Sequence, residues 1–152
     1  MKFILIVFAT IATCFVVEIP NSRAAGMDEV IIQTTSGEKT WSIELASNNQ
    51  ARAKGLMFRK TMAPMTGMLF RFENTAPVSM WMKNTFIPLD MIFADENGRI
   101  TYIHKGAVPQ SLDVISSRGP VRYVLEINAG EADSQGLSKG NRMLHPWILP
   151  TQ

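Results

Sequence analysis

Cysteine is nearly absent from this sequence of 152 residues: the single cysteine, Cys14, lies in an apolar N-terminal segment. If that segment is removed, the mature protein contains no thiol. It can then form no disulfide, use no cysteine nucleophile and bind no metal through thiolates. The stability of the folded chain must therefore come from packing.

The sequence also lacks an apolar run long enough to cross a membrane as a helix. Residues 3–17 are apolar or weakly polar, and this run of about 15 residues is shorter than the roughly 20 that a membrane span needs. Lys2 precedes the run, and the sequence Ser22-Arg23-Ala24-Ala25 follows it. A basic start, a short apolar run and a small-residue exit are typical of a secretory signal peptide.

We therefore predict a signal peptide over residues 1–24, one mature domain over residues 25–152, and export to the periplasm or the extracellular space without a stable membrane anchor. Cleavage after Ala25 is the alternative to cleavage after Ala24. Residues 11–14 also resemble a lipoprotein processing site weakly, but Thr13 is larger than the residue that usually precedes the lipidated cysteine. Lipidation of Cys14 is the less favoured alternative.

A strong charge of either sign is absent too. The precursor has 15 basic and 13 acidic residues, and cleavage removes Lys2, Arg23 and Glu18, so 13 basic and 12 acidic residues remain and the mature charge is +1. A nearly neutral chain has no electrostatic reason to bind nucleic acid or an anionic membrane. We expect a monomer whose partner is an extracytoplasmic ligand or protein.

Short segments that favour β-strands fill the mature chain. Trp41, Ile43 and Leu45 alternate with polar residues, which is the pattern of a half-buried strand. Asn97-Gly98 is a strong signal for a hairpin turn. The predicted strands cover residues 29–34, 40–46, 67–72, 78–83, 90–94, 99–105, 121–127 and 142–148.

Two short helices are also predicted. Ser47 can cap a helix that runs through Lys54 and ends at Gly55, and residues 129–135 allow a second helix before Gly136. Many short strands with two short helices predict a mainly β fold (β-rich α+β), a small barrel-like or strongly curled sheet of about seven to nine strands. Such a sheet protects its edges. An open sheet with helices on one side is the alternative.

Three blocks of sequence are similar to a known family. The blocks are GLMFR at 55–59 with GMLF at 67–70, then WMKNT at 81–85 with PLD at 88–90 and Phe93, and finally LEINAG at 125–130 with Gly136-Leu137 and Gly140. Together they resemble the domain-of-unknown-function 192 family over residues 30–143. The resemblance implies a compact, often exported β-rich domain with no established activity. Asn141 stands where the family often has an aspartate, so a carboxylate role there does not carry over.

The densest group of polar residues among apolar ones contains Arg59, Lys83, Asn84, Thr85 and Asp90. In the structural interpretation, which we favour, Asn84 and Thr85 hold the backbone of their own loop, and Asp90 pairs with Arg59. In the functional interpretation, the same groups line a pocket for a small polar ligand or a peptide terminus.

Trp81 and Met57 extend this candidate site. If residues 78–83 form a strand, Trp81 and Lys83 share one face, and an exposed tryptophan in such a place is typical of a recognition hot spot. Met57 belongs to the first family-like block. The candidate ligand-binding residues are therefore Met57, Arg59, Trp81, Lys83, Asn84, Thr85 and Asp90.

The methionines provide an alternative, the binding of Cu(I), because thioethers are soft ligands that suit this ion. Met62, Met65 and Met68 recur at intervals of three residues, and His104 or Met57 could add a further donor. Against this, Met68 lies in the GMLF block and is expected in the core, where methionine fills irregular gaps. Packing is therefore the favoured interpretation.

The sequence has no motif of a known catalytic site: no Gly-x-Ser-x-Gly elbow, no His-Glu-x-x-His and no phosphate-binding loop. We therefore predict a non-enzymatic binding or interaction module without a cofactor. A carboxylate-based hydrolase using Asp90, Asp113 or Glu126 is the alternative, because carboxylates need no motif to meet in space. Two carboxylates about 5–10 Å apart in an open pocket would favour the enzyme. A closed Arg59–Asp90 pair without a cavity would favour the module.

Overall fold

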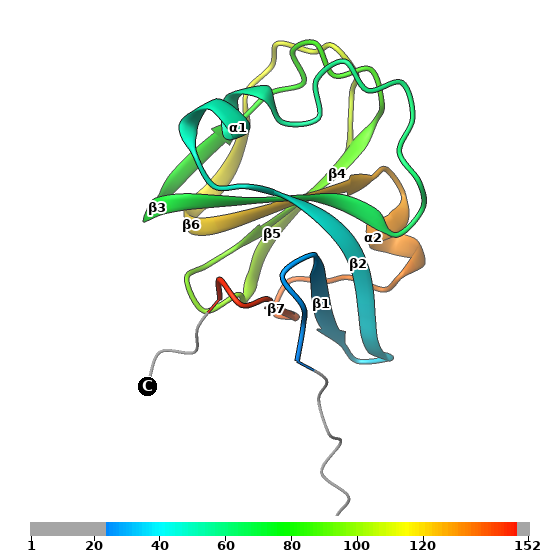
Figure 1. Ribbon diagram of the computed structural model, residues 1–152, viewed down its shortest axis with the longest axis vertical. Coiled ribbons are helices and arrows are strands. Elements are labelled where there is room, and N and C mark those ends of the chain that lie inside the picture. The colour runs from blue at the N-terminus through cyan, green and yellow to red at the C-terminus, as the bar shows by residue number, and fades with distance from the viewer. Residues whose placement is uncertain (1–23, 149–152) are drawn as a thin grey trace, which may run out of the picture.

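The computed structural model describes residues 24–148, which form one curled sheet of seven strands with two short helices (Figure 1). This confirms the predicted mainly β, strongly curled architecture. In chain order the elements are β1 (Glu29–Thr34), β2 (Gly37–Ala46), α1 (Asn49–Lys54), β3 (Thr66–Met80), β4 (Leu89–Ala94), β5 (Ile100–Ala107), β6 (Ile115–Asn128), α2 (Glu131–Ser134) and β7 (Arg142–Leu144).

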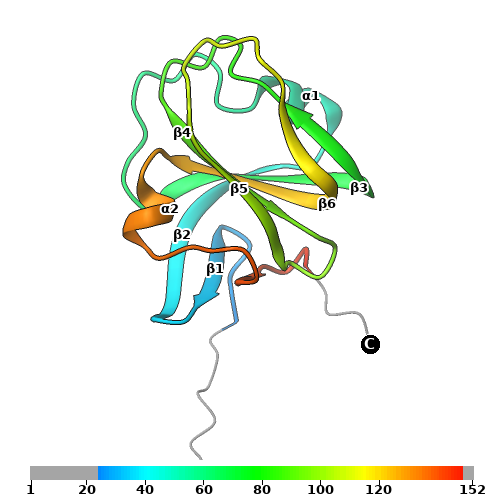
Figure 2. The same ribbon diagram turned by 180° about the vertical axis from the view of Figure 1, so that it is seen from behind.

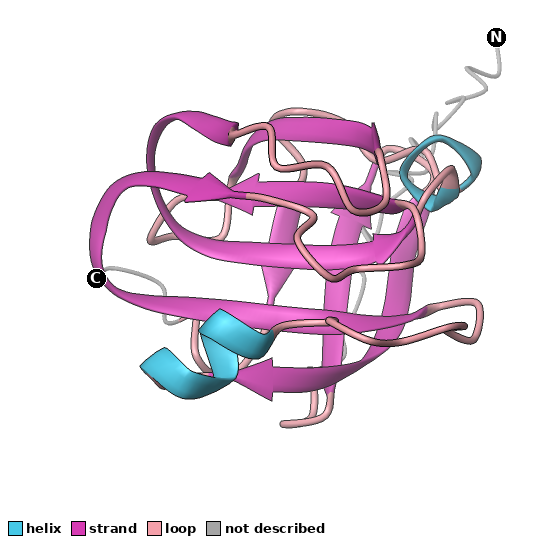
Figure 3. Ribbon diagram, turned by 90° about the horizontal axis from the view of Figure 1, so that it is seen from above, coloured by secondary structure: helices cyan, strands magenta, loops and turns pink. Residues whose placement is uncertain are grey.

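Neighbouring strands follow the order β5-β4-β6-β3-β2-β1-β7. β2 and β3 are parallel, and the other neighbours are antiparallel. A parallel pair needs a crossover connection, and residues 47–65, which include α1, provide it here. Figure 3 shows the strands bending as the sheet curls.

The two ends of this strand order come together at the β4–β5 turn. The Met143 amide of β7 donates to the Gly98 carbonyl at 2.7 Å, and the Ile100 amide donates to the Asn141 carbonyl at 2.9 Å. Gly98 has a φ of 76°, and a Cβ at this position would lie 2.3 Å from the Met143 carbonyl oxygen. The turn therefore requires glycine, and its contacts cover part of the edge that an open sheet would expose.

Alternation along the strands gives the sheet two apolar faces. Leu69 and Leu125 face one cluster of buried residues, while their chain neighbours Phe70 and Val124 face the other, as the period of two in a strand requires. The α2-side cluster contains Val30, Ile32, Trp41, Ile43, Leu69, Ile92, Ala94, Ile100, Tyr123, Leu125, Ile127, Ala132, Leu137, Met143 and Ile148. The α1-side cluster contains Ala46, Leu56, Met68, Phe70, Val78, Met82, Ile87, Leu89, Met91, Phe93, Ala107, Ile115, Val121 and Val124.

The structure corrects several predicted boundaries; for example, the predicted strand at 142–148 is the short β7, which ends at Leu144. The segments at 67–72 and 78–83 are one strand, β3, whose pairing with β6 continues beyond an irregularity between Arg71 and Ala76. This strand ends at Met80, so the block WMKNT lies in a loop. β6 begins at Ile115, six residues before the predicted start at Val121, because its first residues pair with the end of β3. The cap of α1 is Asn48 and not Ser47, since the Asn48 side chain accepts from the Ala51 amide at 2.8 Å.

The predicted signal peptide, Cys14 and the sequence before Ala24 lie outside the described residues. Export, cleavage and the lipidation alternative therefore stay predictions from the sequence. Within residues 24–148, no helix is both long and apolar enough to cross a membrane.

Candidate functional site

A cavity of about 260 Å³ opens on the α1 side of the sheet. In Figures 1 and 2, α1 and the loops at residues 55–65, 81–88 and 108–114 lie together at one end of the sheet. The cavity is lined by residues 52–57, Phe70, Phe72, residues 79–81, Thr85 and Glu126. It is therefore built by α1 and its exit, by both ends of β3, by the following loop and by β6.

Backbone hydrogen bonds hold these loops against one another. The Phe58 amide donates to the Asn84 carbonyl at 2.8 Å, and the Gln110 amide donates to the Thr85 carbonyl at 3.0 Å. The exit of α1 turns at Gly55, which has a φ of 47°, and a Cβ there would approach the Phe70 ring at 3.3 Å. Glycine thus lets the chain pass closely over Phe70, and this brings Leu56 and Met57 to the cavity wall.

Glu126 is a buried ionisable residue that lines this cavity. Its position on β6 lies across from Met68 of β3 on one side and Met91 of β4 on the other, and both methionines belong to the α1-side cluster. Only 4% of Glu126 is exposed, and its carboxyl forms no hydrogen bond or ion pair with any residue between 24 and 148. Burial raises the pKa of this carboxyl to about 8, so it is mostly protonated at pH 7.

Two cationic residues of α1, Arg52 and Lys54, line the same cavity. The Arg52 guanidinium donates to the carbonyls of Ser47 at 3.0 Å and Arg71 at 2.9 Å, and it lies 5.5 Å from the centre of the Phe72 ring. These contacts fix Arg52 in place as a part of the wall. Lys54 is exposed, so its charge remains in contact with solvent.

The structure brings three predicted site residues, Met57, Trp81 and Thr85, to the cavity. Trp81 is 49% exposed, and the Lys83 ammonium lies 5.1 Å from the centre of its ring. The Asn84 amide nitrogen lies 3.9 Å from the Met57 sulfur. Trp81 and Lys83 are therefore adjacent as predicted, although they lie in a loop and not on a strand. A role in binding for these residues stays a prediction.

Arg59 and Asp90 lie elsewhere, and the predicted pair between them is wrong. Arg59 donates to Glu44 of β2 at 2.6 Å. This hydrogen bond lowers the pKa of Glu44 and raises the pKa of Arg59. Asp90 alternates with Leu89 and Met91, so its side chain points to the opposite face of the sheet from the α1-side cluster.

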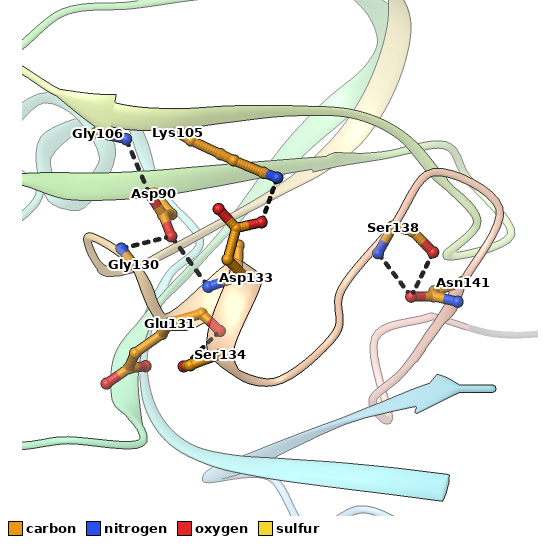
Figure 4. A network of polar contacts seen from close by, with 10 residues as sticks. Asp90, Lys105, Gly106, Gly130, Glu131, Asp133, Ser134, Ser138 and Asn141 are labelled. Atoms are coloured by element: carbon orange, nitrogen blue, oxygen red, sulfur yellow. Dashed lines mark hydrogen bonds and ion pairs between the residues drawn. The ribbon is translucent and has the colours of Figure 1, made fainter. Parts of the chain in front are cut away.

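Asp90 instead organises the start of α2. Its carboxylate accepts from the amides of Gly106 and Gly130 at 2.9 Å and of Ala132 at 3.0 Å (Figure 4). The residue is fully buried, and these three donors satisfy it. Nearby, Asn141 accepts from the Ser138 amide at 2.8 Å, so the residue that replaces the family's frequent aspartate holds its own loop.

The methionines of the copper alternative do not all belong to one cluster. Met68 is buried in the α1-side cluster and Met62 packs against it, whereas Met65 packs against the α2-side cluster. His104 lies 3.5 Å from the Tyr102 hydroxyl through its Nδ1 atom. Among the described residues, no group of three or more His, Cys, Asp and Glu side chains could hold a metal ion. This arrangement agrees with packing roles for Met62, Met65 and Met68.

From the sequence, Glu126 is considered only as a carboxylate of the hydrolase alternative and not as a ligand-binding residue. The sequence feature that could have singled it out is its position in the mainly apolar strand from Val121 to Ile127. Glu126 is the one carboxyl in this strand, and its neighbours Leu125 and Ile127 are apolar. Of the residues from 24 to 148, Glu126 is the only carboxylate that lines this cavity, so these residues do not provide the carboxylate pair that the hydrolase alternative requires.

The fold and the cavity define a small β-sheet protein with a ligand-sized pocket at the loop end of its sheet. A sequence model of the domain-of-unknown-function 192 family (DUF192), described as "Uncharacterized ACR", matches residues 30–145, and the chain belongs to this family. The three blocks that carry the family resemblance each supply residues to the cavity: Met57 and Phe70, Trp81 and Thr85, and Glu126.

Two solved structures are similar to this chain over most of its length. A protein from Sinorhizobium meliloti 1021 with a provisional transcription-regulator name is 45% identical with a TM-score of 0.78, covering 84% of this chain and 99% of its own. A protein of unknown function from Novosphingobium aromaticivorans DSM 12444 is 37% identical with a TM-score of 0.74, covering 76% of this chain and 82% of its own. No curated protein matches the chain.

Proposed function

We propose that this protein is a non-enzymatic binding module that holds a small, mainly apolar molecule in the cavity beside α1. The observation that carries the proposal is Glu126, a buried carboxyl that lines the cavity without a partner among the described residues. A largely desolvated polar group that no protein group hydrogen-bonds costs free energy. A ligand that supplies the missing hydrogen bond recovers part of that cost, so Glu126 provides an orienting contact.

The composition of the cavity wall supports this proposal. Ligand pockets are mostly apolar and aromatic, with a few polar groups that orient the ligand. Leu56, Phe70 and Met80 supply apolar wall, and Thr85 and Glu126 supply polar groups. A single lining carboxylate is the reason that we prefer binding to paired-acid hydrolysis. We place this function outside the cytoplasm because of the signal-like residues 1–25.

The test is an NMR titration of the ¹⁵N-labelled mature protein with four probes of one size: benzamide, benzoate, benzamidinium and toluene. We expect at least one probe to shift the amide signals of residues 52–57 and of Glu126. If none of the four shifts these signals at millimolar concentration, the proposed function is wrong.

Two variants on β3 show whether a probe occupies the cavity. Ser79 is exposed and lines the cavity, so Ser79→Phe fills it from the wall and should weaken binding about tenfold or more. Asn74→Phe is the matched control, because Asn74 is exposed on the same strand and does not line this cavity. Trp81→Ala should weaken binding about fivefold, as expected for an aromatic residue at a binding site.

A further inference from the structure

We propose, on the basis of the proposed function, that the cavity takes an uncharged molecule with a carbonyl-type oxygen, which accepts a hydrogen bond from the protonated carboxyl of Glu126. The geometry at the base of the cavity supports this choice. Met68 and Met91 lie across from Glu126 on the two neighbouring strands, so neither offers a hydrogen bond donor to a carboxylate. A carboxyl in such surroundings keeps its proton and becomes a donor.

The charged groups around Glu126 make a cationic ligand unfavourable. Arg52 and Lys54 line the cavity from α1. On the far side of Met68 from Glu126, Met68 pairs with Glu44 of β2, which is bound to Arg59. On the far side of Met91, Met91 pairs with His104 of β5. Among the described residues, Glu126 is the only carboxylate that lines the cavity, while the cations Arg52 and Lys54 also line it. The Glu73 carboxylate, 3.9 Å from Arg52, lies outside the lining.

The aromatic rings of Phe72 and Trp81 also disfavour a cationic ligand. The Arg52 guanidinium lies over the Phe72 ring and the Lys83 ammonium over the Trp81 ring. These two cation–π positions at the cavity are thus occupied by the protein's own cations. A ligand cation at Phe72 or Trp81 would have to displace them or lie beside them.

An anionic ligand is also unfavourable at the base. The Arg52 guanidinium already donates to the carbonyls of Ser47 and Arg71, and Lys54 is exposed. A ligand carboxylate at the base would therefore be buried beside Glu126 with one neutral donor and no cation committed to it. A neutral carbonyl meets this donor without bringing in a charge.

Thr85 supplies a second contact that fits a neutral amide. Thr85 lines the cavity, and its hydroxyl donates to the Lys83 carbonyl at 3.3 Å, so the hydroxyl oxygen keeps its capacity to accept. The wall thus offers one donor and one acceptor. A primary amide carries both complementary groups, so benzamide is the probe that matches the site.

The experiment compares the four isosteric probes at pH 7 and pH 9 with the mature protein, Glu126→Gln and Glu126→Leu. Benzamide should bind at least about tenfold more tightly than benzamidinium, benzoate or toluene at pH 7. Its affinity should fall about tenfold at pH 9, because the protonated fraction of Glu126 falls by that factor when its pKa is about 8. Glu126→Gln keeps a donor, so it should bind benzamide within about threefold of wild type at both pH values. Glu126→Leu should bind benzamide and toluene equally.

Each other outcome overturns a defined part of this inference. If benzamidinium or benzoate binds more tightly than benzamide, the ligand is charged and the inference is wrong, while the binding module stands. If toluene equals benzamide in the wild type, Glu126 makes no contact with ligand and the inference is also wrong. If no probe shifts the cavity signals, the proposed function fails and this inference fails with it.

Discussion

Glu126 on β6 lies directly opposite Met68 on β3, in the middle of an apolar face. The folded state raises the pKa of Glu126 from 4.5 to about 8 through burial. Between these pH values the folded protein therefore holds a proton that the unfolded chain has lost. The contribution of Glu126 to the free energy of unfolding is therefore greatest below pH 4.5, and it decreases as the pH rises to about 8.

We expect Glu126 to reduce the free energy of unfolding by up to about 5 kcal/mol across this window. The measurement is urea denaturation from pH 5 to pH 9 for wild type and Glu126→Gln. The difference between the two proteins isolates Glu126 from Glu44 and His145, whose lowered pKa values act in the opposite direction. Parallel pH profiles for the two proteins would contradict the prediction.

Asp90→Ala should destabilise the fold strongly, by about 3 kcal/mol or more, because three backbone amides, of which that of Ala132 is buried, lose their acceptor. Asp90→Asn should have a smaller but clear effect, since one of its two side-chain atoms can no longer accept. Thermal and urea denaturation measure both. Asp113→Asn is the control, because Asp113 is exposed and should change stability by less than about 0.5 kcal/mol. Equal effects at Asp90 and Asp113 would refute the capping role.

Arg59→Ala should cost less than about 1 kcal/mol, although its bond to Glu44 is short. The side chains of Arg59 and Glu44 are 34% and 58% exposed, so water and salt screen the pair. Since the pair lowers the pKa of Glu44, its contribution should disappear as the pH falls through that pKa, below 4.5. Urea denaturation at pH 7 and pH 3 tests this. A loss above 2 kcal/mol at pH 7 would show a different role for Arg59.

The double variant Met62→Leu, Met65→Leu should bind Cu(I) no less tightly than wild type, within about threefold, in competition with a Cu(I) chelator. Leucine replaces methionine with little change in packing, and Met65 packs on a different cluster from Met62 and Met68. A tenfold loss of affinity in the double variant would instead support the copper alternative.

Mass spectrometry of the protein exported by its native host should find a mature chain that begins at Ala25 or Gly26 without a lipid. The basis is the combination of Lys2, the short apolar run and the small residues before the predicted cleavage site. A chain that begins before residue 20, or a lipid on Cys14, would refute this prediction.

Much of the fold could be predicted because its determinants are local. Alternation around Trp41 predicted β2, and the Asn97-Gly98 turn predicted the β4–β5 hairpin. The prediction failed where pairing between distant segments decides the structure. The residues between Arg71 and Ala76 carry no strand pattern of their own, yet β3 continues past them because β6 pairs on both sides.

The candidate site shows the same division. Proximity in sequence placed Trp81 beside Lys83 and Thr85, and these residues do lie together. Arg59 and Asp90 are far apart in sequence, and only the register of the sheet determines that they face different neighbours. The sequence offered Glu126 only as a possible catalytic carboxylate, since a lone carboxyl in a strand shows nothing about the cavity that it meets.

The sequence by itself determined the signal-like pattern of residues 1–25, the period of two along the strands and the main turns, since each depends on composition or on neighbouring residues. Tertiary structure alone decided that Arg59 bonds Glu44, that Asp90 caps α2 and that Glu126 meets a cavity. The physical reason is that a strand has two faces and two neighbours. Which partners its side chains meet depends on strand order and register, and these are settled only when the whole sheet closes.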